Sequence, residues 1–397
     1  MKSQVNSAPR IDQNQSKDNC DLIIVSTISV TIEAFLASGM LLANRMGQNV
    51  CGVCSGDDSA CILRLRDKGV TIHAVPLSRA LSPLADIQAL WSIWRLLNKL
   101  HPRCVHTHTP KAAFIGQLAA FLAGVPLRIN TVHGLYFVNQ VGMRRKIFRT
   151  LELLACRMAH RIICVSQEDV SYLTEECGLP ASRITTRPVG VDLQRFQTHP
   201  DSALVAMELR RKLDMPEKAV VVGIVARMVR EKGFCELLDA VKLLRERGHN
   251  AYLLHVGELD NSRGDGLSLD SIETTGIAPF CRFVGSQQDV PRWLATMDIY
   301  CLPSYREGFP VSVMEAMAME LPCVVTNIRG CREAVRADID GILVPPRDAQ
   351  ALADALEKLI CSPELRKRMG AAAAERARTS FDRVKLDTAT LDEYGFD

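Results

Sequence analysis

PSYREGFPVSVMEAMAMELPCVVTNIRGCREAVRADIDGILVPP, residues 303–346, contains Glu307 and Glu315 with seven residues between them. We expect Glu307 in the loop that leaves a strand. Glu315 is expected about one turn into a helix that begins near Pro310, because proline is favoured at the first helical position. Carboxylates placed in this way can face one ligand at different depths, and the unpaired N–H groups of the helix start can bind a phosphate. The stretch therefore predicts a strand, loop and helix that hold a sugar nucleotide.

The length and composition indicate a globular protein of two domains. At 397 residues the chain is too long for one ordinary core. Apolar residues make up 47% of the chain and charged residues 23%, as in folded rather than disordered proteins. The net charge of +3 is too small to indicate a nucleic-acid partner.

We expect neither a secretory signal nor a membrane span. Residues 1–20 are polar, which predicts a disordered tail, and acidic residues precede the first apolar run where a secretory signal would be basic. A membrane-spanning helix needs roughly 18–20 apolar residues. Ala112–Leu127 comes nearest to that requirement, but Gln117 and two glycines interrupt it.

The cysteines favour a reducing cytosol. Fourteen of them are scattered through apolar strands and helices, where cysteine acts as a small buried hydrophobe. Cys51 and Cys54 form a C-x-x-C with Cys61 and His73 downstream, which leaves zinc or redox chemistry as an alternative. A zinc site needs four ligands at closer, paired spacings, so a core strand is the preferred interpretation.

Short apolar runs alternate with amphipathic stretches along the chain, a pattern that predicts parallel sheets covered by helices. Strands are expected at Leu22–Val25, Val50–Val53, Thr71–Val75, Cys104–His108, Arg128–Val132, Arg161–Val165, Ala219–Val225, Ala251–His255, Arg282–Val284, Ile299–Leu302, Cys323–Thr326 and Gly341–Val344. Helices are expected at Asp86–Leu100, Lys111–Leu122, Phe234–Arg247, Pro291–Ala295, Pro310–Met319, Ala351–Ile360, Pro363–Thr379 and Phe381–Tyr394.

The pattern breaks after Thr185 and restarts beyond a stretch that contains prolines and a glycine, which we interpret as a hinge at 188–200. We expect one Rossmann-like domain over 21–187 and a second over 201–380. A last helix over 381–397 is expected to pack back on the N-terminal domain. Two doubly wound halves place a ligand cleft at the carboxyl ends of their strands.

Two cations stand at the start of the second half. Arg227 follows a strand, and Lys232 and Gly233 lead into a helix, so both cations are expected in one strand-to-helix loop on the cleft side. Such cations can neutralise a diphosphate that gains charge as its bond to a sugar breaks. Two solvated surface cations are the alternative, and the arrangement of Glu307 and Glu315 makes the binding role the preferred one.

Several segments resemble the retaining family 4 glycosyltransferases of GT-B fold: REKG, PSYREGFP with MEAMA and LP, and DGILVPP. The likeness runs from Leu22 to about Ile360. In the first half, SRALSPLADIQAL, HTHTPKAAFIGQLAAFLAGVPLRINTVHGLYF and HRIICVS resemble bacterial members that build capsule, exopolysaccharide or O-antigen units. The resemblance implies an α/β fold of two doubly wound parallel-sheet domains facing across a cleft, with an N-terminal acceptor-binding domain and a C-terminal nucleotide-sugar-binding domain.

The resemblance also implies a donor site in the second half. At that site Arg227 and Lys232 would bind the diphosphate, and Glu315 would hydrogen-bond the ribose hydroxyls. Glu307 would face the donor sugar, which backbone amides would also contact. The base would stack near 282–285, mostly through backbone. The donor-binding residues implied are Arg227, Lys232, Arg282, Phe283, Gly285, Glu307, Gly308, Phe309, Pro310, Val311, Ser312 and Glu315.

The catalytic residues implied are Glu307, His133, Arg227 and Lys232. His133 in TVHG would touch the donor sugar near the reacting carbon. A histidine after a strand is often a core residue bonded to a carbonyl, but Gly134 beside it, in a loop, favours the functional role.

The loop around 26–31 would close over the phosphates or the acceptor through Ser26, Val30 and Thr31. It reads STISVTIEA where many family members have paired glycines.

No metal and no cofactor are expected, since the nucleotide sugar is a substrate. Asp338-Ile339-Asp340 fits the D-x-D that other transferases use for a divalent ion, but it precedes Gly341, and turn chemistry explains both aspartates. His106 and His108 share one strand face, and a structural role is preferred for them over a metal pair.

Gly142–Ala159 reads GMRRKIFRTLELLACRMA, with five basic residues beside an apolar stripe. Such a helix can lie on an anionic bilayer surface, or it can be a core helix with a solvated basic face. A lipid-linked acceptor favours the bilayer, on the inner face of the cytoplasmic membrane.

The predicted reaction transfers a sugar, with retention, from a nucleotide diphosphate, by family habit UDP-hexose or UDP-N-acetylhexosamine, to a polyprenyl-diphosphate-linked glycan. A nucleotide-sugar epimerase of the same architecture is the alternative. A catalytically silent binding subunit is disfavoured by the intact set of charged residues. An oxidoreductase is disfavoured because no G-x-G-x-x-G follows the first strand.

Overall fold

The computed structural model describes residues 20–78, 82–259, 266, 272–273 and 276–396. The expected N-terminal tail and part of the SRALSPLADIQAL segment lie outside these ranges. The chain divides into two compact units. One comprises the chain up to Asn130 with Leu154–His160 and Phe396, and the other comprises Thr131–Leu153 and Arg161–Gly395. The expected domain limits stay predictions.

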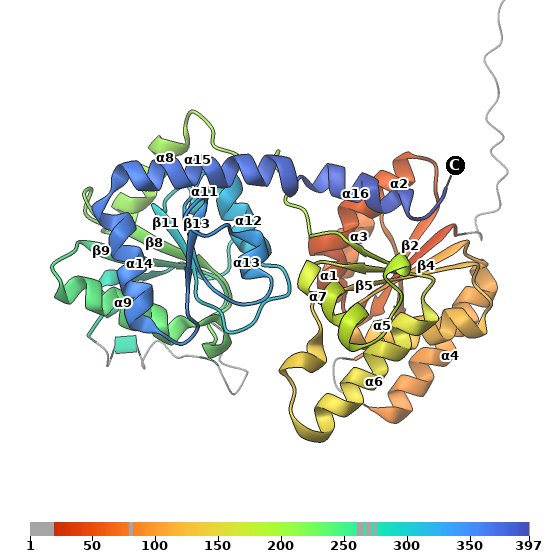
Figure 1. Ribbon diagram of the computed structural model, residues 1–397. Helices are drawn as coiled ribbons and strands as arrows, with labels where there is room; N and C mark the ends of the chain where they lie inside the picture. Colours follow the sequence, from red (N-terminus) through yellow and green to blue (C-terminus); the bar gives the residue numbers. More distant parts are fainter. Residues whose placement is uncertain (1–19, 79–81, 260–265, 267–271, 274–275, 397) are drawn as a thin grey trace, which may run out of the picture. The chain divides into compact units, whose positions relative to one another are not determined.

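The first sheet has seven strands in the order β3-β2-β1-β4-β5-β6-β7. The registered pairs β1–β2, β1–β4, β2–β3 and β6–β7 are parallel (Figure 1). The strands are β1 (Leu22–Val25), β2 (Val50–Ser55), β3 (Thr71–Val75), β4 (Cys104–His108), β5 (Leu127–Val132), β6 (Arg161–Cys164) and β7 (Ile184–Thr186). Burial on both faces explains why β1 and β2 are continuous runs of apolar or small residues.

Helical segments connect these strands. They are α1 (Ser29–Thr31), η1 (Ile32–Leu36), α2 (Ala37–Arg45), α3 (Ser59–Asp67), α4 (Pro83–Leu100), α5 (Pro110–Leu122), η2 (Tyr136–Asn139), α6 (Gly142–Met158), α7 (Gln167–Ser171), η3 (Tyr172–Glu176) and η4 (Ala181–Arg183). Proline opens α4 and α5, as expected at a first helical position. The two helices pack against each other.

The second sheet has six parallel strands in the order β10-β9-β8-β11-β12-β13. They are β8 (Val220–Val225), β9 (Ala251–Val256), β10 (Cys281–Phe283), β11 (Ile299–Leu302), β12 (Cys323–Thr326) and β13 (Gly341–Val344). The chain runs outward from β8 in one direction and from β11 in the other, so the strand order reverses between them. Ligands of open parallel sheets bind at the carboxyl ends of strands at such a point.

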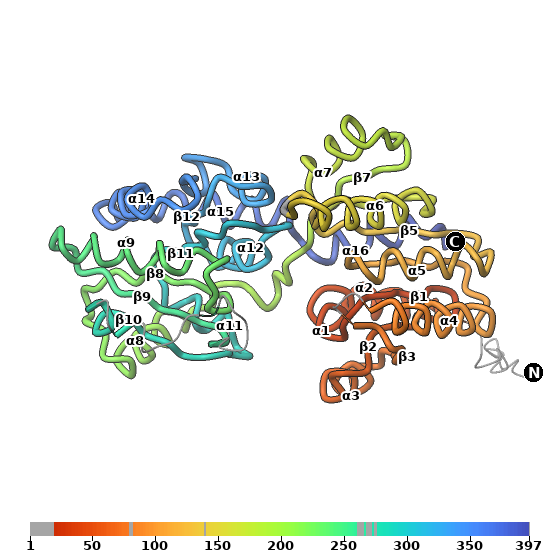
Figure 2. The backbone as a smooth tube through the Cα atoms, turned by 90° about the horizontal axis from the view of Figure 1, so that it is seen from below, coloured from red at the N-terminus to blue at the C-terminus, as the bar shows by residue number. Residues whose placement is uncertain are grey.

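Helices flank this sheet, as Figures 1 and 2 show. They are α8 (Ser202–Lys212), η5 (Arg230–Lys232), α9 (Phe234–Glu246), η6 (Ala278–Phe280), α11 (Val290–Leu294), α12 (Val311–Ala318), α13 (Cys331–Ala334), α14 (Ala349–Cys361) and α15 (Pro363–Ser380). After α15 the chain continues into α16 (Arg383–Asp392). The helix α14 packs against α9, and α12 packs against α15. Asp348 and Ser362 cap α14 and α15 by accepting backbone N–H groups.

Most expected strands are confirmed within one or two residues, and the expectation of a loop over 26–31 is wrong in its second half. Ser29 begins α1, which continues through η1 into α2. The short strand β7 was not expected, nor were α3 and α8.

The expected hinge pairs with the end of α15. The Val191 N–H donates to the Phe381 carbonyl at 2.7 Å, and the Arg383 N–H donates to the Val191 carbonyl at 3.0 Å. A side chain on Gly190 would overlap the Arg383 backbone, so glycine is required there. The segment is therefore an ordered pair of extended chains at this point.

All fourteen cysteines are free thiols, and all but Cys235 and Cys361 are buried. Cys51 and Cys54 lie in β2, as the core-strand interpretation predicted. Within the described ranges, no helix combines the length and the apolar character that crossing a bilayer requires.

Candidate active site

A lysine and a glutamate meet where the strand order reverses. Lys232 ends the η5 turn that follows β8, and Glu307 lies in the loop that follows β11. The Lys232 Nζ and Glu307 Oε1 atoms are 2.6 Å apart, with side chains only 24% and 12% exposed. The Ser304 hydroxyl donates to the same oxygen at 2.7 Å. The sequence placed both residues on this side of the sheet, and the structure joins them directly.

The two loops that carry this pair are packed tightly together. A Cβ on Gly233 would overlap the Pro303 carbonyl, and Gly233 has a φ of +70°, so only glycine fits. The Tyr305 N–H donates to the Glu231 carbonyl at 2.9 Å. The Arg306 guanidinium bonds the Glu231 carboxylate at 2.7 Å. These contacts fix the backbone on both sides of the Lys232–Glu307 pair.

The turn that contains His133 touches the loop that contains Glu307. A Cβ on Gly308 would overlap the His133 carbonyl oxygen, and a Cβ on Gly134 would lie 2.9 Å from the Gly308 Cα. From the other side, a Cβ on Gly330 would overlap the Gly308 carbonyl. Three backbone segments therefore meet at Gly308 with no side chain between them, and His133 belongs to the same cluster as Glu307.

His133 is a half-buried histidine directly after β5. Burial lowers its pKa to about 4, so the ring is neutral near pH 7. A neutral imidazole can accept a hydrogen bond from a sugar hydroxyl through one ring nitrogen or donate one to it through the other.

Arg227 lies just past the end of β8, before the η5 turn, and is half-buried. Its carbonyl accepts the Val229 N–H at 3.0 Å. The structure therefore places Arg227 at the same sheet edge as Lys232.

Glu315 lies in α12, the helix that begins after Pro310 as expected. Burial raises the pKa of Glu315 to about 7, while the charges of Arg383 and Arg195 act in the opposite direction. Arg195 lies in the segment expected as the hinge, and Arg383 lies just after α15, in the stretch that pairs with that segment. A carboxyl held this way changes charge near neutral pH.

We expect Glu315→Gln to stabilise the protein at alkaline pH. A carboxyl whose pKa is raised on folding contributes stability below its unfolded pKa of 4.5, and that contribution is lost as the pH rises through about 7. The variant should therefore gain on the order of 2–3 kcal/mol at pH 8–9 and little at pH 5. Thermal melts across this pH range measure the difference. Glu375→Gln, an exposed change on α15, is the control, and equal curves for the two variants would contradict the prediction.

Arg282 is used structurally. Its guanidinium donates to the backbone carbonyls of Leu213, Asp214, Pro279 and Cys281. Phe283 packs its ring near Phe234 and His255. Gly285 has a φ of +71°, and its carbonyl accepts the Gly257 N–H at 2.9 Å. The Arg282 guanidinium is therefore occupied by backbone carbonyls, and the expected base-binding role of this segment stays a prediction.

The residues expected at the acceptor loop do not share one environment. Ser26 is fully buried after β1, Thr31 is half-buried, and Val30 is 46% exposed. The Thr27 and Thr109 hydroxyls bond each other at 2.7 Å. The start of α1 therefore occupies the second half of the segment that was expected to be a loop.

The two aspartates of the D-x-D string, Asp338 and Asp340, stabilise the turn that precedes β13. The Asp340 carboxylate, fully buried, accepts the Arg336 N–H and the Arg336 Nε–H, each at 2.6 Å. Asp338 has a φ of +61°. His106 and His108 are buried with ring centroids 4.2 Å apart. In the part of the chain that the structure describes, no three His, Cys, Asp or Glu side chains gather where they could hold a metal ion.

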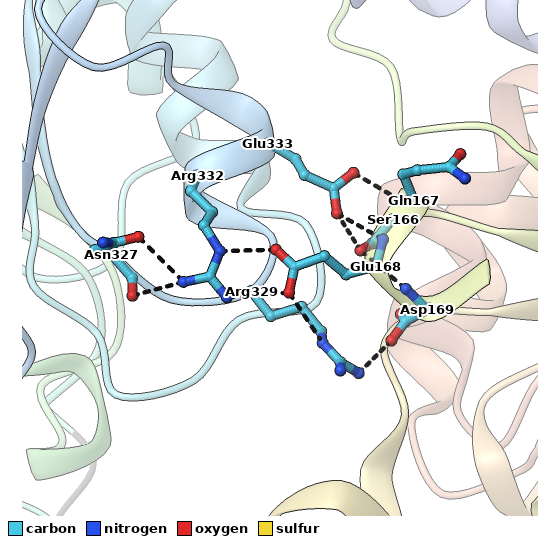
Figure 3. Close-up of polar contacts among 8 residues, drawn as sticks. All are labelled: Ser166, Gln167, Glu168, Asp169, Asn327, Arg329, Arg332 and Glu333. Carbon is cyan, nitrogen blue, oxygen red and sulfur yellow. Dashed lines mark hydrogen bonds and ion pairs between the residues drawn. The ribbon is translucent and has the colours of Figure 1, made fainter. Parts of the chain in front are cut away.

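A second polar cluster, shown in Figure 3, was not expected from the sequence. The Glu333 carboxylate accepts the Ser166 hydroxyl and the Gln167 and Glu168 N–H groups at the start of α7. Arg332 bonds Glu168 through two nitrogens, at 2.8 and 3.0 Å. The residues of this cluster come from two segments that are far apart in the sequence, so no local sequence pattern indicates that they bond one another.

Known proteins resemble the chain in both halves. The family model for glycosyl transferases group 1 matches residues 206–376, and that for the glycosyl transferase 4-like domain matches residues 37–190. The chain is 30% identical to an Escherichia coli UDP-Gal:alpha-D-GlcNAc-diphosphoundecaprenol alpha-1,3-galactosyltransferase, over 74% of this chain and 76% of the relative. It is 28% identical to the Staphylococcus aureus capsular polysaccharide biosynthesis glycosyltransferase CapM, over 78% and 80%.

Solved structures share the fold. Anabaena HepE in complex with UDP aligns with a TM-score of 0.80 at 20% identity, over 94% of this chain and 99% of the other. A sucrose-phosphate synthase from Thermosynechococcus elongatus aligns with a TM-score of 0.79 at 20% identity, over 95% and 98%. The expected pair of Rossmann-like parallel sheets is confirmed, and nothing in these comparisons supports the epimerase alternative.

Proposed function

Because the chain belongs to the glycosyl transferases group 1 family, we propose that it moves a sugar from a UDP-sugar, a hexose or N-acetylhexosamine, to a polyprenyl-diphosphate-linked glycan during surface polysaccharide assembly. The glycosyltransferase activity follows from the family. The donor and acceptor are inferred from the chemistry of the site and from the substrates in the names of relatives, among them diphosphoundecaprenol-linked sugars.

The Lys232–Glu307 pair supports this function most directly. It lies at the strand-order reversal of the second sheet, beside the His133 turn and the start of α12. We propose that the incoming diphosphate draws Lys232 to itself, with Arg227 beside it, and that Glu307 then faces a sugar hydroxyl. The helix start, Gly308–Ser312, offers N–H groups to the same ligand.

The reaction retains the anomeric configuration in this proposal. The acceptor hydroxyl attacks the anomeric carbon on the face that the nucleoside diphosphate leaves, and its proton passes to the departing phosphate oxygen. The bond from carbon to phosphate oxygen breaks as the new glycosidic bond forms. The residues lower the barrier by stabilising the leaving charge and by positioning, and neither a metal ion nor a cofactor takes part.

A donor screen tests the function. Release of nucleoside diphosphate from several UDP- and GDP-sugars is measured with and without a lipid-linked diphosphate sugar, in the presence of EDTA. We expect release that depends on both one donor and the acceptor. Release of an epimerised sugar without acceptor, or activity that EDTA abolishes, would contradict the proposal. An NMR spectrum of the product gives the anomeric configuration.

We also propose that the enzyme works on the inner face of the cytoplasmic membrane through the start of α6. Val141, Met143 and Ile147 are 83%, 68% and 43% exposed, and the basic residues 144–146 between them are exposed as well. Farther along, Leu153 and Ala155 are buried. The first turns thus present apolar and basic side chains together, while the later turns contribute buried side chains such as Leu153 and Ala155.

Replacing Arg144, Arg145 and Lys146 by alanine should abolish most binding to anionic vesicles at low salt, since each basic residue near such a surface contributes about 1 kcal/mol. Sedimentation with vesicles that contain phosphatidylglycerol measures the bound fraction. The control removes equal charge from exposed positions elsewhere, at Arg211, Lys212 and Lys218. Equal binding by both triple variants would overturn the proposed surface.

A further inference from the structure

Two buried acids face the backbone of residues 135–137, the loop that follows His133. Glu152 comes from α6 and is 8% exposed, and Asp169 comes from α7 and is 0% exposed. Taking a carboxyl group out of water costs several kcal/mol unless its partners compensate. The contacts of both acids show which part of the chain they serve.

Glu152 holds the backbone of the loop. Its Oε1 atom accepts the Tyr136 N–H at 3.2 Å, and the Phe137 N–H also faces the carboxyl and lowers its pKa. Its buried Oε2 atom has no hydrogen-bond partner within the described chain. Burial, with a contribution from the nearby charge of Asp169, raises the pKa of Glu152 to about 8. Glu152 is therefore mostly protonated at pH 7.

Asp169 holds the preceding residue of the same loop. The Leu135 N–H faces its carboxyl and lowers its pKa. The Asp169 Oδ1 atom bonds Arg329 at 2.6 Å, and the buried Oδ2 atom has no hydrogen-bond partner in the residues described. Burial raises the pKa of Asp169 to about 6, with Arg329 acting against the shift and Glu333 adding to it. In Figure 3 the Arg329 cation lies between Asp169, at 2.6 Å, and Glu168, at 3.7 Å, and its shorter contact compensates the negative charge of Asp169.

Three consecutive backbone amides, at residues 135–137, therefore face two carboxyl groups. Aromatic contacts fix the same residues from outside: Tyr136 packs edge-on against Phe148 with centroids 4.8 Å apart, and Phe137 is fully buried. The loop begins directly after the His133–Gly134 turn. A shift of these amides would move that turn off the Gly308 backbone.

We propose that Glu152 and Asp169 are positioning residues for sugar transfer, which hold the amides of Leu135–Phe137 so that the His133–Gly134 turn stays seated against Gly308. The inference rests on the proposed function, in which His133 faces the donor sugar. A loop whose only task was to fold could be held by neutral or apolar groups at lower cost, because unpaired buried carboxyl oxygens are unfavourable.

The pair works with one negative charge. Near pH 7 the ionised Asp169 is matched by Arg329, while Glu152 stays neutral. As the pH rises through about 8, Glu152 ionises and adds a second negative charge next to that of Asp169. The carboxyl of Glu333 already acts on Asp169 in the same direction. A carboxyl with a raised folded pKa loses its stabilising contribution in this direction. The loop N–H groups favour the ionised carboxyl, but burial is the larger effect and opposes it, so the closed arrangement of the loop around Glu152 should lose stability on the alkaline side.

Four variants of the full chain test the proposal: Glu152→Ala, Glu152→Gln, His133→Ala and the double change of Glu152 and His133 to alanine. The Glu152→Ala change should lower kcat by about 10–100-fold, with a donor KM within about 3-fold of the parent, because a misplaced group costs rate more than binding. Glu152→Gln keeps an acceptor for the Tyr136 N–H and should restore kcat to within about 3-fold at pH 7. It should also keep its activity above pH 8, where the parent declines.

Leu153→Ala is the matched control. Leu153 is the neighbouring buried residue of α6, its truncation creates a cavity, and its hydrocarbon side chain accepts no hydrogen bond from the loop amides. It should lower the melting temperature while leaving kcat per folded molecule unchanged. If Glu152→Ala behaves like Leu153→Ala, or if Glu152→Gln shows the same alkaline decline as the parent, the positioning role is wrong.

The double variant separates this inference from the proposed function. If Glu152 acts through His133, the double change should cost no more rate than His133→Ala alone, because the two residues act as a unit. A further loss in the double variant overturns the inference. Full activity of His133→Ala would instead remove His133 from the proposed site. That conclusion would hold whatever the Glu152 variants show.

Discussion

Lys232→Ala is expected to lower kcat by roughly 10²–10³ with the fold intact, since loss of one preorganised charge at a leaving group has an effect of this size. The Lys232 ammonium lies 2.6 Å from the Glu307 carboxylate, so the free enzyme keeps it at the site rather than in solvent. Its removal also leaves Glu307, only 12% exposed, without its cation. Arg227→Ala should have an effect of the same order. Steady-state kinetics with donor and acceptor measure both.

Arg230→Ala is the matched control for this prediction. Arg230 opens the same η5 turn and is an exposed cation, but its guanidinium points to the Cys235 thiol at 3.4 Å rather than to Glu307. Its loss should change kcat by less than about 3-fold, because an exposed cation interacts weakly. Equal activity of the Lys232 and Arg230 variants would remove the proposed diphosphate site.

Gly308→Ala should abolish nearly all activity and also lower stability. The added methyl group would overlap the His133 carbonyl oxygen, so either the His133 turn or the Glu307 loop must move. A displacement of about 1 Å at a catalytic group can cost 100-fold in rate. Overpacking of this kind costs about 1–3 kcal/mol of folding free energy. Kinetics and thermal melts of the purified variant measure the two effects separately.

Gly248→Ala serves as its comparison. Gly248 has a φ of +86°, and a Cβ there would meet nothing within 4 Å. This change strains the backbone by about 1 kcal/mol without a clash, and kcat should stay at the parental value. If Gly308→Ala retained parental kcat, the contact at Gly308 would not govern catalysis.

The sequence predicted the sheets well because parallel strands covered on both faces are continuous apolar runs. Ile299–Leu302 and Cys323–Thr326 have the expected limits. The strand at Ile184–Thr186 was missed because three residues, two of them exposed threonines, form no hydrophobic pattern. The helix at Ser59–Asp67 was missed although Asp58 caps it by accepting the Cys61 N–H, since its apolar face is short.

The site was predicted only in part, since local spacing does not report tertiary contacts. The E-x7-E stretch placed Glu307 in a loop and Glu315 in a helix, as found. The direct bond between Lys232 and Glu307 depends on β8 and β11 being neighbours in the sheet, which no local pattern states. Glu152 was missed because an acid among basic residues on an amphipathic helix reads as part of the solvated face. In the structure its side chain is buried, at 8% exposure, instead of lying on the solvated face.

The distribution of the thiols gives a simple way to compare these variants. Among the fourteen cysteines, Cys361 at the end of α14 is exposed and Cys235 is partly so, while the rest are enclosed in the core. A maleimide dye should thus attach first at the end of α14, far along the chain from the proposed donor residues. Partly exposed Cys235 can react next, and each dye molecule beyond these two then reports an opening of the interior, so the later labelling ranks the variants by how often their cores open.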